Sequence, residues 1–195
     1  MNTDTLPEIT FQPATSTEHF EQIVRLQSQN LCKTLSTEQQ EQQGFLFAEH
    51  TVPLLQLMAS QIPQVVALHK NKVIGYNLAM TATMENEVPT LAPMFREFHK
   101  SQYRGRSLTA YNFFVGGQVC VDKHFRGLGL LSKLYNATAS QVEEDYQLCI
   151  TEVAVRNTKS LKIHQKMGFE VVSSHNDGLE DWNVVVWDIR NLLSS

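Results

Sequence analysis

A basic, glycine-bearing run, Phe125–Leu131, lies where a buried strand pattern ends and a helix pattern begins. The stretch before it, Phe113–Val121, is mostly apolar with a glycine break and predicts a buried strand. The stretch after it repeats apolar residues at helical spacing as far as Val142. The first N–H groups of a helix lack an internal partner, and together with the helix dipole they attract anions. Because glycine has no Cβ, Gly127 and Gly129 let a phosphate approach the backbone. The run therefore predicts a diphosphate-binding turn.

Strand and helix patterns intermix along the whole chain, which indicates an α/β (α+β) fold. The chain has 195 residues, of which 42% are hydrophobic, and this suits one globular domain over residues 1–195. Residues 1–8 are polar and lack the apolar core of a signal peptide, so we expect them to be flexible. Segment 83–108 fits no single pattern, and we expect an insertion or loop there.

Charge and cysteine usage exclude several classes of protein. The formal net charge of −4 argues against a nucleic-acid-binding surface, and no apolar stretch reaches the length of a membrane span. Cys32, Cys120 and Cys149 lack metal-ligand or redox spacing and the seven histidines are scattered, so we expect no metal site. Two of these cysteines lie in apolar runs, which suits a reducing compartment. We therefore expect a cytoplasmic protein with neither nucleic-acid nor membrane partners.

A second motif follows in the C-terminal third, where Glu152–Ser160 precedes His164 and the pair Gly168–Phe169. Together with Arg126–Leu131, this motif resembles the GCN5-related N-acetyltransferase superfamily, in its Glu-Val…Asn…Ser…His variant. The resemblance covers roughly residues 9–189 in element order and is specific from about 119 to 169.

The chain departs from the usual pattern of that superfamily at two positions. Leu131 stands where glycine or alanine is usual, although its backbone N–H remains available. His164 stands where a tyrosine often protonates the departing thiolate.

The resemblance implies a mixed, mostly antiparallel sheet of about seven strands, flanked by about four helices, with two strands splayed at the cofactor. It implies acetyl-coenzyme A as cofactor and a small-molecule or peptide amine as acceptor, joined by direct attack in a ternary complex. The diphosphate would bind the turn, where Arg126 adds a fixed charge. The cofactor-binding residues that it implies are Val119, Cys120, Val121, Arg126, Gly127, Leu128, Gly129, Leu130, Leu131, Asn157 and Ser160.

Two residues are candidates for acid–base chemistry. His164 is the candidate acid, because histidine titrates near pH ~6.5, although a histidine simply packed on its helix face is an equal alternative. Glu152 is a candidate base or ammonium-binding group, since a glutamate inside an apolar strand is unusual, but it also fits a solvent-facing position on an exposed edge. A backbone N–H near Val119 or Cys120 is the candidate oxyanion donor.

The sequence also bears on the acceptor site and on possible partners. We expect segment 83–108 to cover the acceptor pocket, with Phe95, Phe98 and Tyr103 near the acceptor; a surface insertion is the alternative. The apolar run 184–187 leaves open a homodimer or a core strand. A coenzyme A-binding module without turnover, regulatory or sensing, is the rival function. A dinucleotide-binding oxidoreductase is disfavoured, because the turn has only two glycines and lies in the middle of the chain.

Overall fold

The computed structural model describes residues 8–190, so the predicted flexibility of residues 1–8 falls, apart from Glu8, outside the described residues. Within that range a seven-stranded sheet has the order β1-β2-β3-β6-β7-β9-β8, and only the β6–β7 pair is parallel. The strands are β1 Thr10–Pro13, β2 Val65–His69, β3 Lys72–Met80, β6 Phe113–Val121, β7 Leu148–Ala154, β8 Glu170–Asn176 and β9 Asp181–Asp188. This confirms the mixed, mostly antiparallel sheet.

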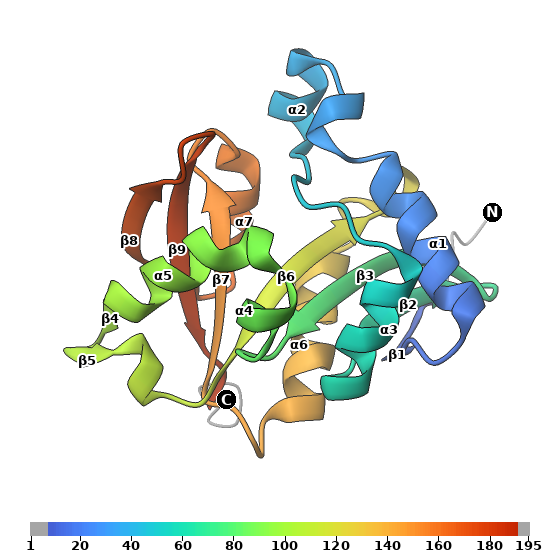
Figure 1. The fold of residues 1–195 in the computed structure, drawn as a ribbon. Helices are drawn as coiled ribbons and strands as arrows, with labels where there is room; N and C mark the ends of the chain where they lie inside the picture. Colours follow the sequence, from blue (N-terminus) through green and yellow to red (C-terminus); the bar gives the residue numbers. More distant parts are fainter. Residues whose placement is uncertain (1–7, 191–195) are drawn as a thin grey trace.

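Helices cover both faces of the sheet (Figure 1). They are α1 Thr17–Ser28, α2 Thr37–Gln43, α3 Val52–Gln61, α4 Met84–Glu87, α5 Ala92–Lys100, α6 Leu130–Val142 and α7 Thr158–Lys166. Helices α1, α3 and α5 pack on one face with alternate strand residues such as Val115 and Ile150. Helix α6 packs on the other face with Phe114 and Cys149. The described residues hold seven α-helices where about four were expected, because α2, α4 and α5 lie in short segments between the main elements.

Segment 83–108 contains α4, α5 and the short strands β4 Gln102–Tyr103 and β5 Arg106–Ser107, so it is mostly ordered structure instead of loop. In Figure 1, α5 of this segment crosses in front of β7 and β9, on the face of the sheet where Phe95 and Phe98 pack.

Strands β6 and β7 separate after a short paired stretch. Their register runs only from Phe113↔Leu148 to Val115↔Ile150, and beyond it the two strands diverge. At the point of divergence, Thr151 Oγ1 donates a hydrogen bond to the Gly116 carbonyl at 2.6 Å. On the opposite side of β6, the pairing with β3 shifts register between Leu78 and Ala79. The splayed strands expected from the sequence are therefore present.

The apolar run Val184–Trp187 belongs to β9, which lies between β7 and β8. Its four side chains are between 0% and 5% exposed, so they form core and offer no surface to a second copy of the chain. Within residues 8–190, no helix combines the length and the apolar composition that crossing a bilayer requires.

Candidate functional site

The turn before α6 forms one wall of a cavity of about 560 Å³, the cofactor cavity. Gly127 and Gly129 have positive φ angles of 83° and 70°, which glycine adopts without strain. A Cβ placed on either glycine would meet no atom within 4 Å, so the space above the turn is open. Gly129 is the N-cap of α6 and has no side chain with which to cap the first N–H groups of the helix. This geometry suits a diphosphate.

Most of the cofactor-binding residues expected from the sequence line this cavity. The exception is Leu128, which is 36% exposed and lies outside the lining. The lining also contains residues that were not among the expected cofactor-binding residues, namely Asn30, Gln43, Gly44, Phe45, Leu46, Phe125, Ser132, Lys159, Ile163 and Lys166. Their most useful signal in the sequence was Gly44, a helix-ending glycine directly before two apolar residues.

Arg126 holds the turn in place through three separate hydrogen bonds. Its Nε donates to the Val121 carbonyl at 3.1 Å, its Nη1 to Gln43 Oε1 at 2.8 Å and its Nη2 to Asn30 Oδ1 at 2.6 Å. The guanidinium therefore ties the end of β6 to the N-terminal segment. Arg126 contributes its positive charge to the cofactor cavity, although each of its three guanidinium nitrogens already donates a hydrogen bond to a protein oxygen.

A second cavity, of about 450 Å³, opens on the other side of Phe45 and Leu46. We call it the acceptor cavity. The two cavities share Val119 on β6 and, at the start of α7, Asn157 and Ser160. Asn157 caps α7 by accepting from the Ser160 N–H at 3.3 Å, and its Nδ2 donates to the Phe45 carbonyl at 3.2 Å. The two cavities thus meet at the mouth of the β6–β7 split.

The two cavities carry opposite charge. Among the described residues that line the cofactor cavity, the charged ones are Arg126, Lys159 and Lys166. Among those that line the acceptor cavity, three are carboxylic acids, Glu152, Asp177 and Glu180, and none is a lysine or an arginine. The first cavity therefore favours an anion and the second a cation.

Glu152 points into the acceptor cavity, as part of a pair with His175. The distance between Glu152 Oε1 and His175 Nε2 is 2.5 Å, and the two side chains are only 10% and 13% exposed. Burial raises the pKa of Glu152 to about 7, against the lowering effect of the hydrogen bond from His175. A solvent-facing edge position is thereby excluded. His175 was not singled out by the sequence, because a lone histidine in an edge strand carries no spacing signal.

His164 lies deeper, at the foot of the acceptor cavity, and is 2% exposed. Its Nδ1 is 2.8 Å from the Ser160 carbonyl oxygen, which can only accept, so Nδ1 carries the proton of the neutral ring. Its Nε2 then accepts from the Tyr135 hydroxyl at 3.0 Å. Burial lowers the pKa of His164 and raises that of Tyr135 well above its usual value. Tyr135 and His164 are therefore both neutral, and the Tyr135 hydroxyl proton lies in the hydrogen bond to His164 Nε2.

The aromatic residues expected beside the acceptor occupy other places. Phe95 and Phe98 form the buried face of α5 and are 1% and 0% exposed. Tyr103 is buried as well, and its hydroxyl donates to Glu170 at 2.9 Å. The apolar stripe of the helix faces the core, as such stripes usually do. The same segment reaches the acceptor cavity through neighbouring residues, namely Thr90, Leu91, Pro93 and Met94.

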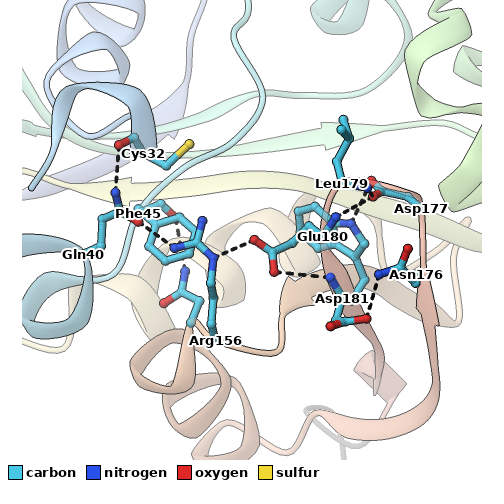
Figure 2. A network of polar contacts seen from close by, with 11 residues as sticks. Cys32, Gln40, Phe45, Arg156, Asn176, Asp177, Leu179, Glu180 and Asp181 are labelled. Atoms are coloured by element: carbon cyan, nitrogen blue, oxygen red, sulfur yellow. Dashed lines mark hydrogen bonds and ion pairs between the residues drawn. The ribbon is translucent and has the colours of Figure 1, made fainter. Parts of the chain in front are cut away.

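Arg156 connects the segments that border the two cavities (Figure 2). Its Nε donates to Glu180 Oε2 and its Nη1 to Gln40 Oε1, each at 2.6 Å, and its guanidinium lies 4.2 Å from the centre of the Phe45 ring. Gln40 in turn donates to the Cys32 carbonyl at 2.9 Å. One side chain thereby joins α2, the Phe45 segment and the β8–β9 hairpin.

Comparisons with known proteins agree with this geometry. A family model described as "FR47-like protein" matches residues 108–176, which contain β6, the glycine turn, α6, β7 and α7. A search of curated proteins finds no match.

Several solved structures share the fold. The NatC complex bound to Gag peptide and CoA is similar with a TM-score of 0.63 at 16% identity, over 93% of this chain and 98% of that chain. Arabidopsis thaliana NAA60 in complex with acetyl-CoA gives 0.64 at 14% identity, over 93% and 99%. An N-acetyltransferase from Staphylococcus aureus Mu50 gives 0.60 at 15% identity, also over 93% and 99%.

Proposed function

We propose that this chain, whose residues 108–176 match the FR47-like family model, is a GCN5-related N-acetyltransferase that transfers an acetyl group from acetyl-coenzyme A to an amine. The observation that carries the proposal is the meeting of a cationic cavity and an anionic cavity at the β6–β7 split. An anionic, diphosphate-bearing carrier suits the first cavity and an ammonium suits the second. The two reactants then meet beside Val119.

The split supplies the route for the pantetheine arm. The β6–β7 ladder ends at Val115, and Thr151 then holds the Gly116 carbonyl, so the β6 backbone groups beyond Gly116 on the β7 side would bind an amide-bearing ligand. A β6 N–H near Val119 or Cys120 would polarise the thioester carbonyl, and one such donor is worth ~3 kcal/mol.

We propose direct attack by the amine, without an acetylated cysteine. Burial raises the pKa of Cys120 to about 12, so its thiol is protonated at neutral pH and is a poor nucleophile. Burial also raises the pKa of Cys149.

The acid–base roles fall to groups on either side of the acceptor cavity. Glu152 would take a proton from the acceptor ammonium, since its pKa of about 7 matches the task. The departing thiolate would take the proton that Tyr135 and His164 share at the foot of the same cavity. His164 therefore keeps the acid role expected from the sequence, but acts together with Tyr135.

Calorimetry with coenzyme A, followed by free-thiol release from acetyl-coenzyme A over a panel of amines, tests the proposal. The panel includes peptides, because one similar structure holds a peptide together with CoA. We expect micromolar binding of coenzyme A and thiol release with at least one amine. Binding without release for any amine would favour the module without turnover, and no binding at millimolar excess would refute the proposal.

Gly129→Ala sharpens this test, with Gly105→Ala as its matched control. Both glycines have positive φ, 70° and 75°, and a Cβ on either would meet no atom within 4 Å, so the strain is similar. Only Gly129 lines the cofactor cavity. We expect Gly129→Ala to weaken coenzyme A binding about tenfold or more, and Gly105→Ala to leave it unchanged. Equal effects of the two variants would contradict a diphosphate site at the turn.

A further inference from the structure

His175 and Glu152 meet across an intervening strand. Glu152 lies on β7 opposite Val184 of β9, and His175 lies on β8 opposite Trp182 of β9. The two side chains therefore reach diagonally over β9 to make their contact at 2.5 Å, with both residues lining the acceptor cavity. The contact uses Oε1 of Glu152, so it leaves the second carboxylate oxygen, Oε2, available to another partner.

The surroundings of this pair are acidic. Asp177 and Glu180 come from the β8–β9 hairpin, and Glu97 comes from α5; Asp177 and Glu97 both raise the pKa of Glu152. The further titratable side chains that line the same cavity are His50, His164 and Tyr135. Arg156 is engaged with Glu180. Among the described residues, His175 is therefore the side chain that donates to Glu152 and opposes its protonation.

We propose that His175 is a positioning residue for the acetyl transfer proposed above, on which this inference rests: it binds one oxygen of Glu152 and thereby holds the second oxygen toward the acceptor ammonium. His175 Nε2–H donates to Oε1, which fixes the carboxylate plane. Oε2 is then the atom that receives the proton.

The acceptor nitrogen loses two protons during the reaction, one to Glu152 and one to the thiolate. An N–H bond of the ammonium breaks and an O–H bond forms at Glu152 Oε2. The freed lone pair attacks the thioester carbon, a C–N bond forms, and the C–S bond breaks. The second proton of the nitrogen balances the charge by passing to the thiolate, with the Tyr135–His164 pair as carrier. The proton on Glu152 returns to solvent when the product leaves.

The test compares His175→Leu with His175→Gln. Leucine removes the donor, whereas glutamine keeps an N–H close to the position of Nε2 but cannot titrate. For His175→Leu we expect the acid limb of the kcat/KM pH profile to move up by about one pH unit or more, with a loss of about fivefold or more at pH 7 that alkaline pH restores. For His175→Gln we expect the limb within about half a unit of wild type, because the donor is retained.

The chain offers a matched control in its other His–Glu pair. His99 Nε2 lies 3.2 Å from Glu85 Oε2, on the surface and outside the acceptor cavity. We expect His99→Leu to leave the pH profile unchanged. If His175→Leu and His175→Gln lose activity equally at every pH, His175 has only a structural role and the inference is wrong.

A measurement without substrate separates this inference from the proposed function. Carboxyl carbon NMR follows the ionisation of Glu152 in the free protein, with Glu152→Gln assigning the signal. We expect the midpoint of that titration to rise in His175→Leu and not in His99→Leu. If no amine is acetylated but the midpoint rises, the proposed function fails alone; if acetylation proceeds and the midpoint stays, the role of His175 fails alone. Circular dichroism and coenzyme A binding check that each variant is folded.

Discussion

At Glu152 the chain keeps a carboxyl group where water is largely excluded, and this has a cost in stability. Its pKa of about 7 in the folded protein exceeds the ordinary 4.5, because burial disfavours the charged form more than His175 supports it. For such a group the favourable contribution to folding is complete below pH 4.5 and is lost as the pH rises through 7.

The Glu152→Gln variant should therefore be more stable than wild type above neutrality. We expect a gain of about 1–3 kcal/mol in the free energy of unfolding at pH 8 that disappears below pH 4.5. Urea denaturation over this pH range measures it, and the exposed Glu21→Gln should change the free energy by less than ~0.5 kcal/mol. A pH-independent gain would show that ionisation of Glu152 is not its source.

Sequence reasoning at the residue scale succeeded where a local pattern has one physical meaning. Gly127 and Gly129 were expected to leave room above the turn because they lack a Cβ, and they line the cofactor cavity with open space above them. The position of Phe95 was not readable, because an apolar stripe shows that one helix face is buried but not against what. The role of His175 could not be predicted either, because its partner Glu152 lies on β7, two strands away from β8 in the sheet.

At the scale of elements, the strand–turn–helix unit of β6 and α6 and the following β7 and α7 could be predicted, because their signals are contiguous in the sequence. The segment that separates the two cavities, Phe45 and Leu46, could not be predicted from the sequence. Phe45 and Leu46 lie in irregular chain, and what fixes them is the distant Arg156, which stacks on Phe45 and bonds to Gln40 and Glu180.

The Arg156 contacts predict a measurable loosening when they are removed. In Arg156→Ala we expect faster amide exchange in residues 44–47 and 177–181 and a several-fold higher KM for the acceptor, because both segments border its cavity. Arg156→Lys should restore little, since lysine lacks the planar fork. Arg25→Ala, which removes an exposed helix pair with Glu21, is the control and should change neither quantity. Unchanged exchange in Arg156→Ala would contradict this view.

At the scale of the whole molecule, three distant stretches of chain build the cofactor cavity. Its lining residues come from positions 30–46, 119–132 and 157–166. Side chains such as Arg126 already join these stretches, and a ligand that touches all three would add further contacts between them.

Coenzyme A should accordingly raise the melting temperature. At one hundred times its dissociation constant, a ligand that binds only the folded state adds about 2.7 kcal/mol, or roughly 5–10 °C for a chain of this size. Scanning calorimetry with coenzyme A and with pantetheine, which lacks the diphosphate, makes the comparison. An equal rise with both ligands at equal concentration would argue against the glycine turn as the main binding element.

The place of β9 between β7 and β8 bears on how the protein is made. While the ribosome has released only the part before residue 181, β7 has an open edge and Glu152 faces no completed wall. The glycine turn and α6 have emerged by then. The residues of the cofactor cavity are therefore available before the β8–β9 hairpin completes the acceptor cavity. Until the β8–β9 hairpin forms, the nascent chain exposes the unpaired edge of the apolar strand β7. Chaperones that bind unpaired strand edges would therefore act mainly in that interval.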